Sequence, residues 1–119
     1  MKKEDVVKNN REFDNIIQNG KYVQNKDFII YYMNNTFRKN RFGVSVGKKI
    51  GNAVTRNYYK RVIRNICDNN KKYYSNNKDY IIIMKKGCME LKFSDINDSF
   101  MYLMQKINKE KEQENEETN

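Results

Sequence analysis

The 119-residue sequence contains no histidine, no tryptophan and no proline, and it has only two cysteines. Without histidine, the chain lacks the side chain that most often acts as a general base or a metal ligand, which weakens any hydrolase that would use its own side chains. Without proline, no segment is marked as an interdomain linker. A chain of this length suffices for one compact domain and is too short for two of ordinary size, so we expect one domain.

The chain also lacks long apolar runs. Its first ten residues, MKKEDVVKNN, have no apolar stretch of the kind that a secretory signal needs. No segment reaches the roughly 18 apolar residues of a membrane span, and we therefore expect a cytoplasmic protein with no membrane partner. In a reducing compartment we expect no disulfide between Cys67 and Cys88, and two cysteines alone cannot build a zinc site. Both cysteines are expected in the core or at its boundary.

Positive charge, in contrast, is abundant. The chain has 24 Lys and Arg residues against 15 Asp and Glu, and its net charge is +9. The last eleven residues, 109–119, hold five of the acids and two of the bases, so the rest of the chain is more basic still. Such a protein suits a polyanion, because binding releases the counterions condensed on it, and nucleic acid is the leading class of partner. A membrane surface is disfavoured because the bases accompany no long apolar face and tryptophan is absent.

Hydrophobic periodicity predicts three helices. Residues 11–19 place apolar side chains at helical spacing between Asn10, which can cap the helix, and Gly20, where a stop is expected. The longest helix is predicted from residue 53 to about residue 74. Ser94 can cap a last helix, whose apolar face consists of Ile96, Phe100, Leu103, Met104 and Ile107.

Segments rich in aromatic and β-branched residues predict four strands. A short strand begins at Lys21 or Tyr22, two more lie in DFIIYYM and RFGVSVG, and the asparagine-rich segment NNTFRKN between these two is typical of a hairpin. We expect the three to form an antiparallel meander. The apolar run DYIIIMKKG predicts a buried fourth strand. The order of elements is thus αβββαβα, in one domain over residues 1–108, and the acidic tail 109–119 is expected to be disordered.

A basic block occupies residues 41–65, RFGVSVGKKIGNAVTRNYYKRVIRN, and residues 38–64 hold nine bases and no acid. On a helix, the basic and amide side chains of the TRNYYKRVIR segment fall within an arc of roughly 140°, with no carboxylate among them. Guanidinium and ammonium groups in such an arc suit the phosphates of RNA. The polar arc consists of Arg56, Asn57, Lys60, Arg61 and Arg64, and Val54, Tyr58, Val62 and Ile66 are expected to pack on the opposite side.

Lys48 and Lys49 lie between Gly47 and Gly51, immediately before this helix. The glycines allow a tight turn that can bring backbone amides at the start of the helix toward an anion. By itself this is a weak signal, and it does not match the nucleotide-binding pattern GxxxxGK[ST], so an NTPase is disfavoured.

This block resembles the signature of the bacterial ribonuclease P protein component. The segments EFDNII, DFIIYY and DYIIIMKKG agree more weakly, and the similarity covers residues 8–107. The resemblance implies an α+β fold, an αβββαβα two-layer sandwich like the second domain of ribosomal protein S5, with a left-handed βαβ crossover. It also implies that a catalytic RNA, with mainly RNA-bound Mg²⁺, removes the 5′ leader of precursor tRNA. One protein per RNA is expected, and the protein supplies no catalytic side chain.

The resemblance also assigns the candidate site residues. Tyr58 stands where the family often has a third basic residue and could stack on RNA or pack, and the helical arc favours packing. Ile17 stands where an aromatic is often found, and so it stacks less well on a base. Contacts with the catalytic RNA are assigned to Lys48, Lys49, Arg56, Asn57, Lys60, Arg61 and Arg64, and a cleft for the precursor-tRNA leader is assigned to Phe13, Ile17 and Tyr31. Phe28, on the same strand as Tyr31, is added to the cleft as a further candidate. Core packing is the alternative for Phe13 and Tyr31.

Two rival functions share parts of this pattern. A structural RNA-binding protein, such as a small ribosomal protein, would have the same size and charge, and only the signature separates the two. A protein-only nuclease would need carboxylates clustered around two metal ions about 3.5–4 Å apart. The acids outside the tail are scattered, and none lies in the basic block, so the sequence favours the RNA-binding subunit.

Overall fold

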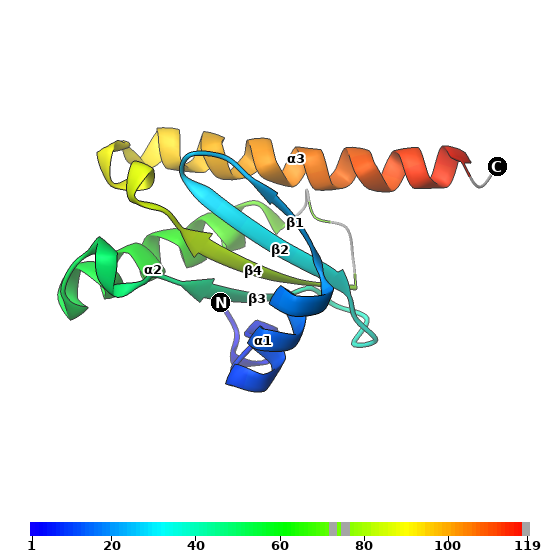
Figure 1. Cartoon of the computed structure of the whole chain (residues 1–119), viewed down its shortest axis with the longest axis horizontal. Coiled ribbons are helices and arrows are strands. Elements are labelled where there is room, and N and C mark those ends of the chain that lie inside the picture. Colours follow the sequence, from blue (N-terminus) through cyan, green and yellow to red (C-terminus); the bar gives the residue numbers. More distant parts are fainter. Residues whose placement is uncertain (72–73, 75–76, 118–119) are drawn as a thin grey trace.

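Three α-helices pack against a four-stranded sheet in the structure, a computed structural model (Figure 1). It describes residues 1–71, 74 and 77–117, and for residues 110–117 it describes the course of the backbone alone. The described elements are η1 (Lys3–Asp5), α1 (Asn10–Asn19), β1 (Lys21–Gln24), β2 (Phe28–Asn34), β3 (Arg41–Ser45), η2 (Lys48–Ile50), α2 (Ala53–Asn69), β4 (Lys78–Met84), η4 (Lys86–Glu90) and α3 (Phe93–Glu117), where η denotes a short 3-10 helix.

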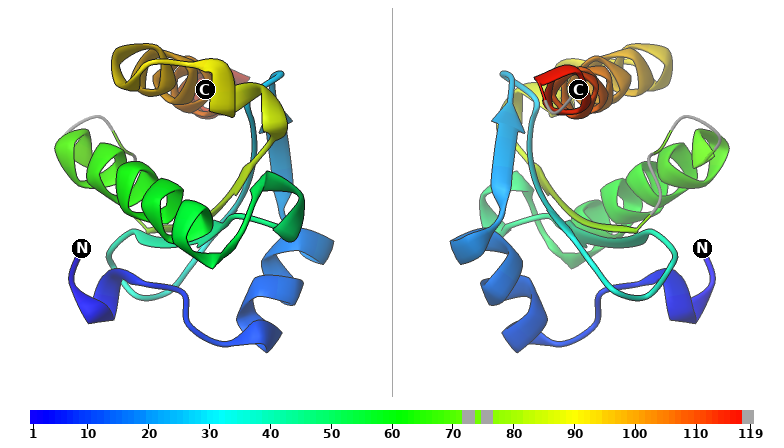
Figure 2. Two further views of the ribbon diagram at one scale, coloured as in Figure 1. Left: turned by 90° about the vertical axis from the view of Figure 1, so that its left-hand side faces the viewer. Right: turned by 90° about the vertical axis from the view of Figure 1, so that its right-hand side faces the viewer.

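The predicted α+β fold and the order αβββαβα are confirmed. Helices α2 and α3 both lie on one face of the sheet and form with it the two main layers (Figure 2). The short helix α1 lies on the opposite face, which it covers only in part (Figure 2). The sheet therefore has one fully covered face and one partly accessible face.

The strands lie in the order β1-β2-β4-β3. β2 pairs antiparallel with β1 and with β4, whereas β3 pairs with β4 in parallel. The predicted antiparallel meander is therefore wrong in one respect, because β4 lies between β2 and β3. Nearly all of β4 is buried, and a strand covered on both faces belongs in the interior of a sheet. α2 joins β3 to β4 as a βαβ unit, whose left-handed crossover stays a prediction.

α1 begins one residue earlier than predicted. The side chain of Asn9, not Asn10, accepts a hydrogen bond from the backbone N–H of Glu12 at 2.8 Å and so caps the helix. Gly20 follows the helix, as predicted. A Cβ at this position would lie 2.7 Å from the carbonyl oxygen of Tyr32 in β2, so only glycine lets the chain turn from α1 into β1 at this distance.

α2 begins where predicted but ends at Asn69 rather than near residue 74. The side chain of Asn70 is buried and donates a hydrogen bond to the carbonyl oxygen of Ile66 at 2.8 Å. This carbonyl is one of the four that lack a regular partner at the end of a helix. Asn70 also donates to the side-chain oxygen of Asn97 at 3.0 Å, so the end of α2 is tied to α3.

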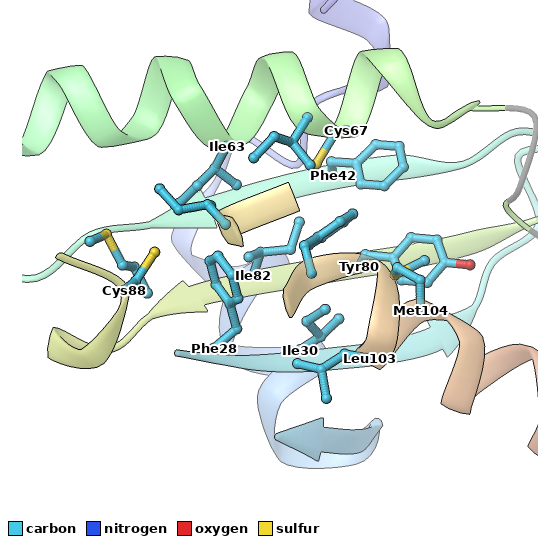
Figure 3. Packing of buried hydrophobic residues seen from close by; sticks show 14 of the residues in the cluster. Phe28, Ile30, Phe42, Ile63, Cys67, Tyr80, Ile82, Cys88, Leu103 and Met104 are labelled. Carbon is cyan, nitrogen blue, oxygen red and sulfur yellow. The ribbon is translucent and has the colours of Figure 1, made fainter. Parts of the chain in front are cut away.

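The main core lies between the sheet and the two helices α2 and α3 (Figure 3). Alternate side chains of β2 and β4 point into it, where the ring of Phe28 meets that of Phe100 with centroids 6.1 Å apart. Burying a large aliphatic or aromatic side chain contributes about 1.5–3 kcal/mol. The fully buried members include Phe28, Ile30, Ile63, Ile66, Tyr80, Ile82, Phe100, Leu103 and Met104.

α3 is longer than predicted. It begins at Phe93, so that Ser94 lies in its first turn, and it continues to Glu117 through most of the tail for which disorder was expected. Glu, Lys and Gln dominate this tail and are good helix formers, and residues 118–119 lie outside the described part of the chain. The predicted apolar face is confirmed, because all five of its residues are buried.

Among the described residues, no helix combines the length and hydropathy that a membrane span requires.

Both cysteines are buried free thiols, as predicted, and this makes them probes of the native state. Burial raises the pKa of Cys67 and that of Cys88, the latter to about 12. Because the thiolate is the reactive form, we expect neither thiol to react with Ellman's reagent in the folded protein at pH 8. Both should react once urea unfolds the chain. Rapid labelling without urea would contradict this burial.

Candidate nucleic-acid interface

α2 presents a basic flank beside its buried side. Ile63, Ile66 and Cys67 of α2 are buried against the core. Asn57 and Arg61 are exposed, whereas the other predicted side chains of α2 are half-buried where the helix borders its neighbours. In the described part of the chain, none of the four cations on this helix forms an ion pair. We call the following residues the basic flank: Lys48, Lys49, Arg56, Asn57, Lys60, Arg61 and Arg64.

Two residues of α2 that were predicted to pack are exposed instead. Val54 is 78% exposed and Tyr58 is 54% exposed. The prediction grouped them with Val62 and Ile66 at four-residue spacing, but such a row drifts by about 40° at each step around a helix. Val54 and Ile66 therefore point about 120° apart, and only the later part of the row reaches the core. Tyr58 packs against the ring of Tyr59, with centroids 5.1 Å apart, and lies on the exposed side.

Lys48 and Lys49 are both exposed, in the η2 turn that precedes α2. Gly51 has a φ of 157°, and a Cβ there would lie 3.1 Å from the side chain of Thr55. A Cβ at Gly47 would meet nothing within 4 Å. Of these two glycines, only Gly51 is required to be glycine, and it shapes the turn into α2. The two lysines beside it are point charges that phosphate can reach.

On the opposite face of the sheet, α1 leaves an apolar region partly accessible. The ring of Phe13 rests on Gly43 of β3, where a Cβ would lie 2.6 Å from it. Phe13, Ile17 and Tyr31 pack around the buried side chain of Ile81, and all three remain half-buried. The structure therefore brings together three of the four residues that were predicted to line the leader cleft.

Phe28, the fourth predicted cleft residue, lies on the other side of the sheet and is completely buried in the main core. Phe28 and Tyr31 are three residues apart on β2, and residues an odd number apart on a strand point to opposite faces. Sequence reasoning also missed Tyr22, which is 57% exposed and lies opposite Tyr31 with ring centroids 5.6 Å apart. The alternation of exposed and buried side chains along β1 could have identified Tyr22, because the adjacent Val23 is buried. We call Phe13, Ile17, Tyr22 and Tyr31 the open sheet face.

The basic flank and the open sheet face meet at the edge strand β3. Lys60 of α2 lines a groove with Phe13 of α1 and with Ser45 at the end of β3. α1 and α2 lie on opposite faces of the sheet, and both border this edge (Figure 2). A cation of the basic flank thus lines the same groove as an aromatic ring of the open sheet face, together with the carboxylate of Asp14.

Arg41 belongs to the basic block of the sequence but has a different environment. Its guanidinium donates two hydrogen bonds to Asp79, at 2.9 and 2.8 Å, and one to Glu12 of α1 at 3.2 Å. The ring of Phe37 lies 4.2 Å from the guanidinium carbon. The hydrogen bonds with Asp79 raise the pKa of Arg41 above its ordinary value. This half-buried cluster links α1, β3, β4 and the β2–β3 connection, so Arg41 positions α1 rather than presenting charge to a ligand.

The described residues do not offer a protein site for a metal ion. No three histidine, cysteine or carboxylate side chains in the described ranges come together in a way that could hold one. The Mg²⁺ that the resemblance implies therefore does not fit a cluster of side chains in this part of the chain.

A family model described as Ribonuclease P matches residues 1–108 of the chain. The ribonuclease P protein component of Mycoplasma mycoides subsp. mycoides SC is 43% identical over 108 residues, which cover 90% of this chain and 99% of that protein. The corresponding protein of Bacillus cereus (strain Q1) is 37% identical over 107 residues, covering 89% of this chain and 93% of its own.

Solved structures give the same result. A Staphylococcus aureus RNase P protein mutant with defective mRNA degradation activity superposes with a TM-score of 0.83 at 33% identity, covering 89% of this chain and 90% of that one. The RNase P protein from Thermotoga maritima has a TM-score of 0.76 at 29% identity, covering 81% of this chain and 91% of its own. The fold described above is therefore that of these proteins.

The Arg41 cluster can be tested by the substitution Asp79→Ala. Asp79 is buried, and its removal leaves a half-buried guanidinium without its main partner. We expect the free energy of unfolding, measured by urea denaturation, to fall by about 3 kcal/mol. The matched control is Lys39→Ala, which removes an ion pair of 3.7 Å with Asp5 at the surface and should cost less than about 1 kcal/mol. Equal effects of the two substitutions would contradict a special role for Asp79.

Proposed function

Because the chain belongs to the ribonuclease P protein family, we propose that its basic flank binds the catalytic RNA and its open sheet face binds the 5′ leader of precursor tRNA. As a member of this family, the protein is a subunit of the ribonuclease P holoenzyme, a tRNA-processing endoribonuclease, and works with the ribonuclease P RNA. We also propose that the protein acts in the cytoplasm and that one copy binds to each catalytic RNA.

Binding of the catalytic RNA to the basic flank is supported by the lack of ion pairs at the cations of α2 in the described part of the chain. Arg56, Lys60, Arg61 and Arg64 lie along one flank of a single helix, and no carboxylate of the described chain neutralises them. Cations that a fold leaves without partners are available to phosphates, and their binding releases counterions from the RNA. Arginine adds paired hydrogen bonds to phosphate oxygens, and the amide of Asn57 can meet a base edge or a ribose hydroxyl.

The open sheet face has the chemistry that single-stranded RNA requires. Unstacked bases bind to aromatic rings, at about 1–3 kcal/mol per base, and Tyr22 and Tyr31 offer two neighbouring rings. Phe13 adds a third ring at the edge of α1, whereas Ile17 can contact a base without stacking. Lys60, which lines the same groove as Phe13, can hold a leader phosphate as well as a phosphate of the catalytic RNA.

Tyr58 belongs to the RNA-binding surface in this proposal. Its ring is 54% exposed and points about 60° around α2 from Arg61, so it can stack on an unpaired base of the catalytic RNA. Where the family often has a further cation, this chain would replace a phosphate contact by a stacking contact.

In this proposal, the RNA catalyses the hydrolysis of the phosphodiester bond. The protein contributes no catalytic side chain, and the required Mg²⁺ is bound mainly by the RNA. The protein side chains bind and orient the RNA strands, so that the scissile phosphodiester lies at the RNA active site. Hydrolysis there leaves a 3′-hydroxyl on the leader.

Reconstitution tests the function as a whole. Purified protein, a bacterial ribonuclease P RNA and a radiolabelled precursor tRNA are combined at low magnesium concentration. We expect cleavage to require the RNA and to be accelerated by the protein, because its cations reduce the repulsion between the two RNAs. Cleavage by the protein without RNA, or no acceleration with it, would contradict the proposal.

The basic flank is tested by Arg56→Ala. Loss of one phosphate contact should weaken binding to the catalytic RNA and reduce the slope of log K against log salt by about one unit. Filter binding over a series of KCl concentrations gives both quantities. The control is Lys106→Ala on α3, which removes an equal charge where the ammonium group stacks on Tyr102 at 4.8 Å. If both variants change the slope equally, the effect comes from net charge and not from the basic flank.

A further inference from the structure

We propose that a second groove, between the N-terminal segment and the C-terminal half of α2, holds the sugar–phosphate backbone of the catalytic RNA. This inference rests on the proposed function and extends it, because it adds Lys3 and Lys8 to the interface. Both residues lie before the basic block and outside the segments that carry the signature. Local sequence therefore gave no reason to group them with α2.

The groove is lined by cations on both walls. Lys3 and Lys8 stand on the wall formed by the N-terminal segment, and Arg61 and Arg64 stand on the wall formed by α2. The other lining residues are Met1, Val6 and Asn65, so that no carboxylate is among them. The hollow is open and has a volume of about 480 Å³. Four cations along an open groove can each contact a phosphate of a nucleic-acid backbone, whereas a small molecule would require a more enclosed site.

The N-terminal wall is held in place by contacts that leave its lysines available. Val6 forms a parallel bridge with Phe42 of β3, and the backbone N–H of Val7 donates to the carbonyl oxygen of Phe42 at 3.0 Å. The side chain of Val7 is buried under α1. Lys3 and Lys8 are exposed, and neither forms an ion pair in the described part of the chain. A wall fixed before binding reduces the entropy that binding would otherwise cost.

The catalytic RNA is the occupant that these observations favour. Arg61 and Arg64 belong to the basic flank as well as to the groove, so the two cationic surfaces are continuous and one strand can contact both. The acidic tail of the chain is a poor occupant, because α3 carries it away from the N-terminal segment toward the far end of the molecule (Figure 1). The leader is assigned to the open sheet face, where the aromatic rings lie.

The test uses the full-length protein with Lys3→Gln and Lys8→Gln, singly and together. Binding to the catalytic RNA, with no precursor tRNA present, is measured by filter binding over a series of salt concentrations. We expect each single substitution to reduce the slope of log K against log salt by about one unit and the double substitution to reduce it by about two. The matched control, with the same loss of charge on α3, is Lys106→Gln with Lys109→Gln. It should leave the slope close to that of the unsubstituted protein.

Three outcomes would overturn the inference. If the double variant and its control lower the slope equally, net charge explains the effect. If binding to the catalytic RNA is unchanged but the holoenzyme loses affinity for precursors with longer leaders, the groove belongs to the leader. If neither changes while Arg56→Ala still weakens RNA binding, the proposed function stands and the groove has no part in it. Urea denaturation of each variant shows that the fold is retained, so that a loss of binding is not a loss of structure.

Discussion

The sheet depends on the burial of β4, which is covered on both faces along almost its whole length. Tyr80 and Ile82 face the main core, and Ile81 faces α1. A strand with this pattern is stable only between two neighbours and between two layers, so β2 and β3 pair with its two sides. This places β3 at the edge of the sheet. It also places α1 on the face opposite α2 and α3.

The edge position of β3 brings two chemically different surfaces together. α2 follows β3 and carries a flank of cations, while α1 crosses the other face and leaves aromatic rings accessible. The surfaces that we propose for a phosphate backbone and for unstacked bases therefore lie on either side of one strand. The proposed division of RNA contacts between the two surfaces depends on this arrangement.

Basic residues that belong to the same block of the sequence have different environments in the fold. Arg41 forms ion pairs with Asp79 and Glu12, and it links α1 to the sheet. Arg61, in the same basic block, is exposed and has no ion pair with the described residues. The difference lies in carboxylates that are 29 and 38 residues away from Arg41 along the chain. Charge counted along a segment therefore overestimates the charge that is available for binding.

The sequence by itself determined the type and order of the elements, the site of concentrated positive charge and the family, because periodicity, composition and signature are local properties. Tertiary structure alone decided which strands are neighbours, that Phe28 is core while Tyr22 is accessible, and that Tyr58 is exposed. It also decided which cations remain without partners, and that Lys3 and Lys8 stand opposite α2. These facts depend on contacts between residues far apart in the chain, and on the rotation of each helix and strand against its neighbours, which local patterns do not specify.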